Sequence, residues 1–281
     1  MAKPTISELL ASKGRRQLTM TNATDFNTAR AAAEAGIDII SGRGMFDEAQ
    51  IGLVLDQIVK AAPDAVIACN LPATIAYVSD AEAIRAAMIA RDHGADIIYS
   101  SGNTLSRFEA MASVGINCGG HVGLVPIRSS RDGGIRAKGK TLDEALRIYE
   151  ETVAYQNAGA VIVEMECVAA DIAAEISRRV DILVMSLGSG PGCDGQFLFS
   201  ADLLGVLEPR YPGMGKPYDG PLPRHAKRYT NIFDEARSAF AAFKADVASG
   251  EFPTPNHTIR VDPSIVDAFR STIDHVDDHL T

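Results

Sequence analysis

The sequence lacks the features of secreted, membrane-spanning and nucleic-acid-binding proteins. Only four of its 281 residues are cysteine, and no CxxC pair occurs among them. We therefore expect reduced, buried thiols in a cytoplasmic protein, with neither disulfides nor a zinc site. No apolar run reaches the length of a membrane span, about 18 residues, and the first residues lack the apolar stretch of a signal peptide.

Positive charge is also scarce, which bears on the partners of the protein. The formal net charge is −9, so no basic face would dominate and hold a nucleic acid. A small anionic substrate held by a few local cations is compatible with this charge. Hydrophobic residues make up 46% and charged residues 22%, which is typical of a globular protein with a full core.

One local arrangement recurs along the chain: a helical segment, a glycine and a short apolar run. Residues 29–35 precede Gly36 and the apolar run 37–40, and residues 142–165 repeat this order around Gly159. Glycine after a helix adopts the left-handed conformation that ends it. The apolar runs are continuous rather than alternating, which indicates strands buried on both faces, as in a parallel sheet.

The recurrence predicts eight strand–helix units, and so an α/β protein with a (β/α)8 TIM barrel. A doubly wound open sheet is the alternative, but no GxGxxG motif follows the first strand. We expect the barrel over residues 1–252 and a C-terminal extension over 253–281, with one helix at Ser264–Leu280. The predicted strands, the last of them weak, are Leu18–Thr21, Ile37–Ser41, Val66–Asn70, Ile97–Ser100, Ile116–Gly119, Val161–Glu166, Ile182–Leu187 and Leu203–Leu207.

Two long loops follow predicted strands. Arg128–Lys140 is basic and rich in glycine, and we interpret it as an active-site lid, with a solvated mobile loop as the alternative. Glu208–Arg224 is rich in proline, glycine and tyrosine and follows the eighth predicted strand.

Polar residues gather where the predicted strands end. Because the C-terminal ends of barrel strands converge on one pocket, we expect these residues to line it. They are Asn22, Asp25, Ser41–Gly44, Asn70–Pro72, Tyr99–Asn103, His121, Glu164, Glu166, Ser186, Ser189 and Asp194.

Three of these residues carry specific chemistry. Strand alternation places Glu164 and Glu166 on one side, and two inward carboxylates are costly unless they are used or paired. Glu166 lies nearer the mouth and is the candidate base, the alternative being an ion pair with Arg43 or another basic residue. Arg43, between two glycines, would grip a substrate carboxylate, unless it is a surface arginine of a loop. His121 lies in a glycine-rich turn that lets the backbone approach a ligand, or in an ordinary tight turn.

Taken in order, these motifs resemble the ketopantoate hydroxymethyltransferase (3-methyl-2-oxobutanoate hydroxymethyltransferase) family. The resemblance runs from Lys3 to about Phe252. Asp25-Phe26, Asn70–Pro72 and His225–Tyr229 add weaker matches. The most specific segments are Cys118–Pro126 (CGGHVGLVP), Gly133–Gly139 (GGIRAKG), Met165–Val168 (MECV) and Asp194–Gln196 (DGQ).

The resemblance implies a barrel of the phosphoenolpyruvate mutase/isocitrate lyase superfamily, assembled as a homo-oligomer, usually a decamer. Members bind Mg²⁺, hold a 2-oxo acid on it, form its enolate and add a one-carbon unit from methylenetetrahydrofolate. His121 matches a substrate-binding histidine and Glu166 the family's proposed catalytic base.

The sequence departs from the family pattern at the metal site. The family's metal-binding aspartate and substrate-binding serine after the second strand are here Arg43 and Gly44. The aspartate of its Asp-Leu-Pro motif is Asn70, and its Lys-x-Glu after the fourth strand is Tyr99-Ser100-Ser101. Mg²⁺ prefers carboxylate oxygens, so we infer that the usual metal is absent and that these positions bind substrate.

The sequence is compatible with three functions. The first is an aldol-type enzyme that makes or breaks a C–C bond in a small 2-oxo acid, with Glu166 as the catalytic residue. Arg43, Gly44, Asn70, Tyr99, Ser101 and His121 would bind its substrate. The second is a metal-free hydrolase or isomerase on the same barrel, and the third is a non-catalytic paralogue that binds a small acid.

Overall fold

The computed structural model describes residues 3–42, 47–102, 104–206, 224–257 and 264–266. The chain forms two compact units, Met1–Thr230 and Asn231–Thr281, which are described separately. Among the described residues no helix is long and apolar enough to cross a membrane. The expected boundary at residue 252 stays a prediction, and the division between compact units falls earlier in the chain.

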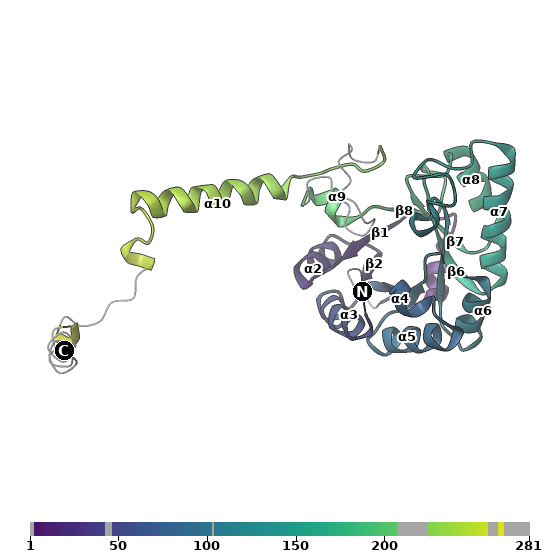
Figure 1. The fold of residues 1–281 in the computed structure, drawn as a ribbon, viewed down its shortest axis with the longest axis horizontal. Helices are drawn as coiled ribbons and strands as arrows, with labels where there is room; N and C mark the ends of the chain where they lie inside the picture. Colours follow the sequence, from purple (N-terminus) through teal and green to yellow (C-terminus); the bar gives the residue numbers. More distant parts are fainter. Residues whose placement is uncertain (1–2, 43–46, 103, 207–223, 258–263, 267–281) are drawn as a thin grey trace. The chain divides into compact units, whose positions relative to one another are not determined.

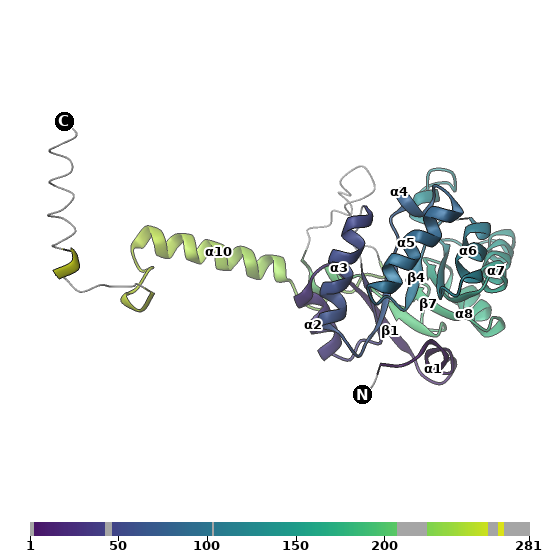
Figure 2. The same ribbon diagram turned by 90° about the horizontal axis from the view of Figure 1, so that it is seen from below.

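The first unit is a closed barrel of eight parallel strands, in which each strand pairs with the next and β8 pairs with β1. Helices surround the strands on the outside (Figures 1 and 2). The predicted (β/α)8 fold is therefore confirmed. The strands are β1 Leu18–Ala23, β2 Ile39–Gly42, β3 Val66–Asn70, β4 Ile97–Tyr99, β5 Cys118–Gly123, β6 Ala160–Glu166, β7 Leu183–Leu187 and β8 Gly195–Phe197.

Local sequence determines where the helices begin and end. Asp47 and Thr141 each cap a helix by accepting a hydrogen bond from the backbone N–H three residues on. Gly159 follows α7 with a φ of 91°, where a Cβ would lie 2.8 Å from a side-chain atom of Ala112. The helices are α1 Ile6–Leu10, α2 Phe26–Glu34, α3 Glu48–Ala61, α4 Ala73–Ala76, α5 Asp80–Asp92, α6 Leu105–Ser113, α7 Leu142–Asn157, α8 Ala170–Arg179 and α9 Ser200–Leu204, with a 3₁₀ turn η1 at Pro126–Arg128.

The core has two layers, one inside the barrel and one between strands and helices. In β6, Ile162 packs in the inner layer, while Val163 and Met165 pack in the outer one. Leu9 of α1 joins the inner layer, so α1 closes the barrel at one end. Burial on both faces explains why the strands read as continuous apolar runs.

Two strands differ from the prediction. The eighth strand is Gly195–Phe197, not Leu203–Leu207, and Leu203 lies in α9. Its three residues contain no apolar run, and they are a strand because they pair with both β7 and β1. The fifth strand extends to Gly123, so His121 lies within the strand rather than past its end. Pairing with β6 holds this glycine-rich segment extended.

The second unit contains α10, Ile232–Ser249, and a 3₁₀ turn η2 at Pro255–His257. No side chain of α10 is buried among the described residues. The ring centroids of Phe243 and Phe252 lie 5.6 Å apart. Of the predicted helix Ser264–Leu280, residues 264–266 are helical, and the rest lies outside the described residues.

Candidate active site

The candidate site is formed where β5 and β6 lie side by side. His121 of β5 pairs in register with Glu164 of β6, and Gly123 pairs with Glu166. His121 Nε2 lies 3.0 Å from Glu166 Oε2, and His121 Nδ1 lies 3.8 Å from Glu164 Oε2. The exposed fraction is 4% for His121 and 7% for Glu164. Strand alternation thus brings together the residues that the sequence placed on one side of the barrel.

The charge of this cluster favours a protonated histidine. Burial by itself lowers the pKa of His121, but the pairing with Glu166 and the negative charge of Glu164 outweigh it, so the pKa lies above its ordinary value. Neither ring nitrogen has an aligned hydrogen bond within the described part of the chain, although both face carboxylates. Both carboxylates therefore favour the protonated form of His121, whose N–H groups can donate to a ligand.

Tyr99, the last residue of β4, lies beneath this cluster inside the barrel. It is 1% exposed and packs in the inner core layer. It pairs in register with Gly119 of β5, two residues before His121. A Cβ at Gly119 would lie 2.6–2.7 Å from three atoms of the Tyr99 ring, so the ring rests directly on the glycine backbone. The role of Gly119 was not foreseen from the sequence, although the residue lies in the most specific motif.

Gly120, the next residue, makes room for an aromatic ring on the opposite face of β5. A Cβ at Gly120 would lie 2.9 Å from the ring of Tyr155 in α7. Tyr155 in turn makes an edge-to-face contact with Phe108, with ring centroids 4.9 Å apart. The two glycines thus admit one aromatic ring on each side of β5, which fixes the strand between the pocket and the outer helices.

The remaining predicted substrate-binding residues lie on or after β3 and β4. Asn70 ends β3 and pairs in register with Tyr99, so the two share one level of the barrel. Ser101 follows β4 and is half-buried. Arg43 and Gly44 lie outside the described residues.

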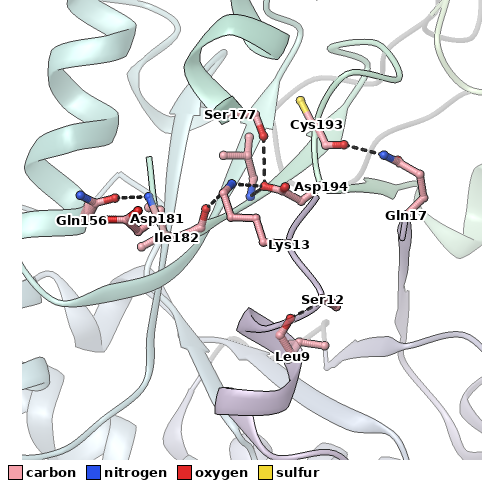
Figure 3. Close-up of polar contacts among 11 residues, drawn as sticks. Leu9, Ser12, Lys13, Gln17, Gln156, Ser177, Asp181, Ile182, Cys193 and Asp194 are labelled. Carbon is pink, nitrogen blue, oxygen red and sulfur yellow. Dashed lines mark hydrogen bonds and ion pairs between the residues drawn. The ribbon is translucent and has the colours of Figure 1, made fainter. Parts of the chain in front are cut away.

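Asp194, expected at the mouth, lies at the opposite end of the barrel, so that expectation was wrong. It directly precedes β8 and accepts hydrogen bonds from the backbone of Val184 at 2.8 Å and from Ser177 at 3.0 Å. Lys13 Nζ lies 2.6 Å from its carboxylate (Figure 3). The contacts stabilise the closure of the barrel near the start of β7.

Other polar residues at strand ends have structural contacts. Asp25 caps α2 through the backbone of Thr28, and this hydrogen bond lowers the pKa of Asp25. Asn22 accepts a hydrogen bond from the backbone of Ser200 at 2.9 Å. Ser189 accepts one from Val168 and donates one to the carbonyl of Met165, joining the loops after β6 and β7.

The predicted lid, Arg128–Lys140, is attached to α7. Arg128 pairs with Glu151 at 2.5 Å, and Arg136 pairs with Glu144 at 2.5 Å. Lys138 forms an isolated bridge with Val168, close to Glu166 in the chain. The loop therefore passes beside the candidate site, and its closure over a substrate stays a prediction.

The described part of the chain contains no cluster of side chains typical of a metal site. No three His, Cys, Asp or Glu side chains among those residues are arranged to hold one ion.

Comparison with known proteins points to one family. The sequence profile described as ketopantoate hydroxymethyltransferase matches residues 47–255. The 3-methyl-2-oxobutanoate hydroxymethyltransferase of Pyrobaculum calidifontis is 32% identical over 275 residues, covering 91% of this chain and 97% of its own length. The enzyme of the same name from Acetivibrio thermocellus is 31% identical over 279 residues, covering 94% and 95%.

Solved structures agree on the fold. Phosphonopyruvate hydrolase superposes with a TM-score of 0.57 at 11% identity and covers 98% of both chains. The 2,3-dimethylmalate lyase described as a PEP mutase/isocitrate lyase superfamily member superposes with a TM-score of 0.53 at 11% identity, covering 98% of this chain and 99% of its own. At such low identity these likenesses concern the barrel alone.

Proposed function

Because this chain belongs to the ketopantoate hydroxymethyltransferase family, we propose that it makes or breaks a C–C bond next to the carbonyl of a small 2-oxo acid. An enzyme of the transferase or lyase type is what its relatives indicate. The observation that carries the proposal is the pair of buried His121 and half-buried Glu166, 3.0 Å apart on neighbouring strands. Active sites of such barrels lie at this end of the strands.

Glu166 acts as the base in this proposal. Its carboxylate takes a proton from the carbon next to the carbonyl, the C–H electron pair forms a C=C bond, and the carbonyl π electrons move onto oxygen. The protonated His121 donates a hydrogen bond to the substrate and attracts its negative charge. Arg43 holds the carboxylate, and Gly44, Asn70, Tyr99 and Ser101 complete the pocket wall. The resulting enolate attacks a one-carbon unit, and the folate donor implied by the family stays a prediction.

We further propose that the chemistry proceeds without the family's magnesium site. Mg²⁺ selects oxygen ligands, normally carboxylates, and the ends of β3 and β4 offer Asn70, Tyr99 and Ser101 instead. The carboxylates of Glu164 and Glu166 face a histidine whose pKa is raised, and an imidazolium between them repels a second cation. The residues described at the site thus fit a metal ion poorly, and no step is assigned to one.

The test is exchange of the substrate proton. In D₂O the enzyme should exchange the hydrogen at C3 of 3-methyl-2-oxobutanoate, observed by NMR, and should do so with EDTA present. Glu166→Gln should slow the exchange about 10²–10⁴-fold, because the base is lost, while the acid still binds. Glu34→Gln, on the exposed face of α2, is the matched control.

Each outcome of this experiment has a clear meaning. Exchange at the wild-type rate in Glu166→Gln would contradict the assignment of the base. Exchange that EDTA abolishes and Mg²⁺ restores would contradict the metal-free proposal. Binding of the acid with no exchange in the wild type would favour the non-catalytic alternative, and cleavage of a different bond would favour the hydrolase or isomerase.

A further inference from the structure

The hydroxyl of Tyr99 is a buried polar group that the contacts of the described residues do not explain. Its oxygen is buried and has no hydrogen-bond partner among the residues that the structure describes. A buried hydroxyl without a partner destabilises a protein by about 1–3 kcal/mol, so such groups are rare and need a reason. A ligand that accepts the hydrogen bond supplies one.

The position of the Tyr99 ring directs this hydroxyl to the candidate site. The ring lies on Gly119, on the same inward face of β5 as His121, since residues two apart share a face. The electrostatic influence of Glu164 reaches the phenol from β6, the strand on the far side of β5. The phenol therefore lies on the inner face of the barrel, the face that also carries His121 and Glu166.

The surroundings keep this phenol a donor. Burial raises its pKa well above the ordinary value, and the carboxylate of Glu164 raises it further. The O–H group is thus retained at every pH at which the barrel is expected to work. A neutral donor fixed in a buried site stabilises negative charge that develops beside it, since it need not reorganise during the reaction.

We propose that Tyr99 donates a hydrogen bond to the carbonyl oxygen of the bound 2-oxo acid and stabilises the oxyanion formed when Glu166 removes the proton. The inference rests on the proposed function and deepens it by assigning the group that takes the developing charge. The tyrosine proton stays on its oxygen throughout, so the proton taken by Glu166 is the only one transferred. Gly119 is required because any side chain there would displace the ring.

Tyr99→Phe tests this role, with Tyr149→Phe as the matched control, because Tyr149 of α7 is partly buried and packs against the core layer between strands and helices. With EDTA present, Tyr99→Phe should slow exchange at C3 of 3-methyl-2-oxobutanoate about 10²–10³-fold, as for loss of one oxyanion donor. Its affinity for oxalate, a planar dianion that resembles the enolate, should fall about tenfold. Its affinity for 3-methyl-2-oxobutanoate itself should change less.

A stability measurement separates this role from a structural one. Because no described residue accepts a hydrogen bond from this hydroxyl, Tyr99→Phe should unfold at the same temperature as wild type or higher, whereas a structurally bonded tyrosine would lose stability. Wild-type exchange and wild-type oxalate affinity in Tyr99→Phe would overturn the assignment of Tyr99 alone. A wild-type protein that neither binds nor exchanges the 2-oxo acid would overturn the proposed function and this inference with it.

Discussion

The two ends of the barrel both bury carboxylates, but they satisfy them differently. At the closed end, Asp194 receives hydrogen bonds from Ser177 and Val184 and an ion pair from Lys13 (Figure 3). At the other end, two carboxylates face the single imidazole of His121, whose nitrogens lack aligned hydrogen bonds in the described part of the chain. The carboxylate of Asp194 thus has protein donors, whereas the ring nitrogens of His121 can still donate hydrogen bonds to a ligand.

This difference separates stability from function within one fold. A fully bonded buried network rigidifies the protein, whereas donors left without protein partners are suited to a ligand. At the closed end, the hydrogen bonds of Asp194 hold the first residues of β7 and β8 in place. Substitutions there should lower stability and leave chemistry intact, and substitutions at the mouth should do the reverse.

The largest effect on stability is expected from Asp194→Ala. The substitution leaves the partly buried charge of Lys13 with only the carbonyl of Ile182 as acceptor and removes the acceptor of two further hydrogen bonds, so the free energy of unfolding should fall by about 3–5 kcal/mol. Urea denaturation measures the change, with Asp92→Ala on the surface of α5 as the control. Exchange activity per folded molecule should be unchanged at low temperature, and its loss would break the comparison between the two ends.

A smaller effect is expected from Lys13→Met. Asp194 then keeps Ser177 and the backbone of Val184 as donors, so the carboxylate is still partly satisfied. The free energy of unfolding should fall by about 1–2 kcal/mol, in the range of one charge-assisted hydrogen bond. A loss equal to that of Asp194→Ala would mean that the ion pair alone sustains the network. The double substitution, measured in the same way, gives the coupling between the two residues.

The smallest effect on stability is expected from His121, at the mouth of the barrel, and it depends on pH. The pKa of His121 is raised in the folded protein despite its burial, because Glu166, Glu164 and, more weakly, Glu151 favour the cation. A group whose pKa is raised on folding stabilises the folded protein most at pH values below its pKa in the unfolded chain, which is near 6.5 for histidine. This stabilisation is lost as the pH rises through the pKa in the folded protein.

The stability of wild type relative to His121→Asn should therefore decline above pH 6.5. Urea denaturation at a series of pH values measures it, with His93→Asn on the outer helices as the control for loss of an imidazole. A difference between wild type and His121→Asn that does not vary with pH would contradict this prediction, because it would show that the pKa of His121 is the same in the folded and unfolded protein.

Most of the fold could be predicted from the sequence because its signals are local. A helix, a glycine and an apolar run recur before four of the eight strands, β2, β4, β5 and β6, and each of these glycines has the positive φ that ends its helix. The eighth strand, Gly195–Phe197, escaped because its identity comes from pairing with β7 and β1 rather than from its composition.

The site was predictable only in part, for a related reason. Alternation along β6 placed Glu164 and Glu166 on one side, and that local rule held. Asp194 was assigned to the mouth because the true β8 was not located, and a residue just before a strand lies at the opposite end from one just after it. The position of Tyr99 depends on the register of β4 with β5, a long-range property that no single segment contains.

The contact between Tyr99 and Gly119 also makes the pocket open to redesign. Shortening the tyrosine to alanine would leave a hole the size of its ring, and the residue across from it has no side chain with which to fill that hole. A 2-oxo acid with a bulkier chain would then find room that the natural pocket denies it. Conversely, a side chain could be introduced at Gly119 only after the ring of Tyr99 has been removed.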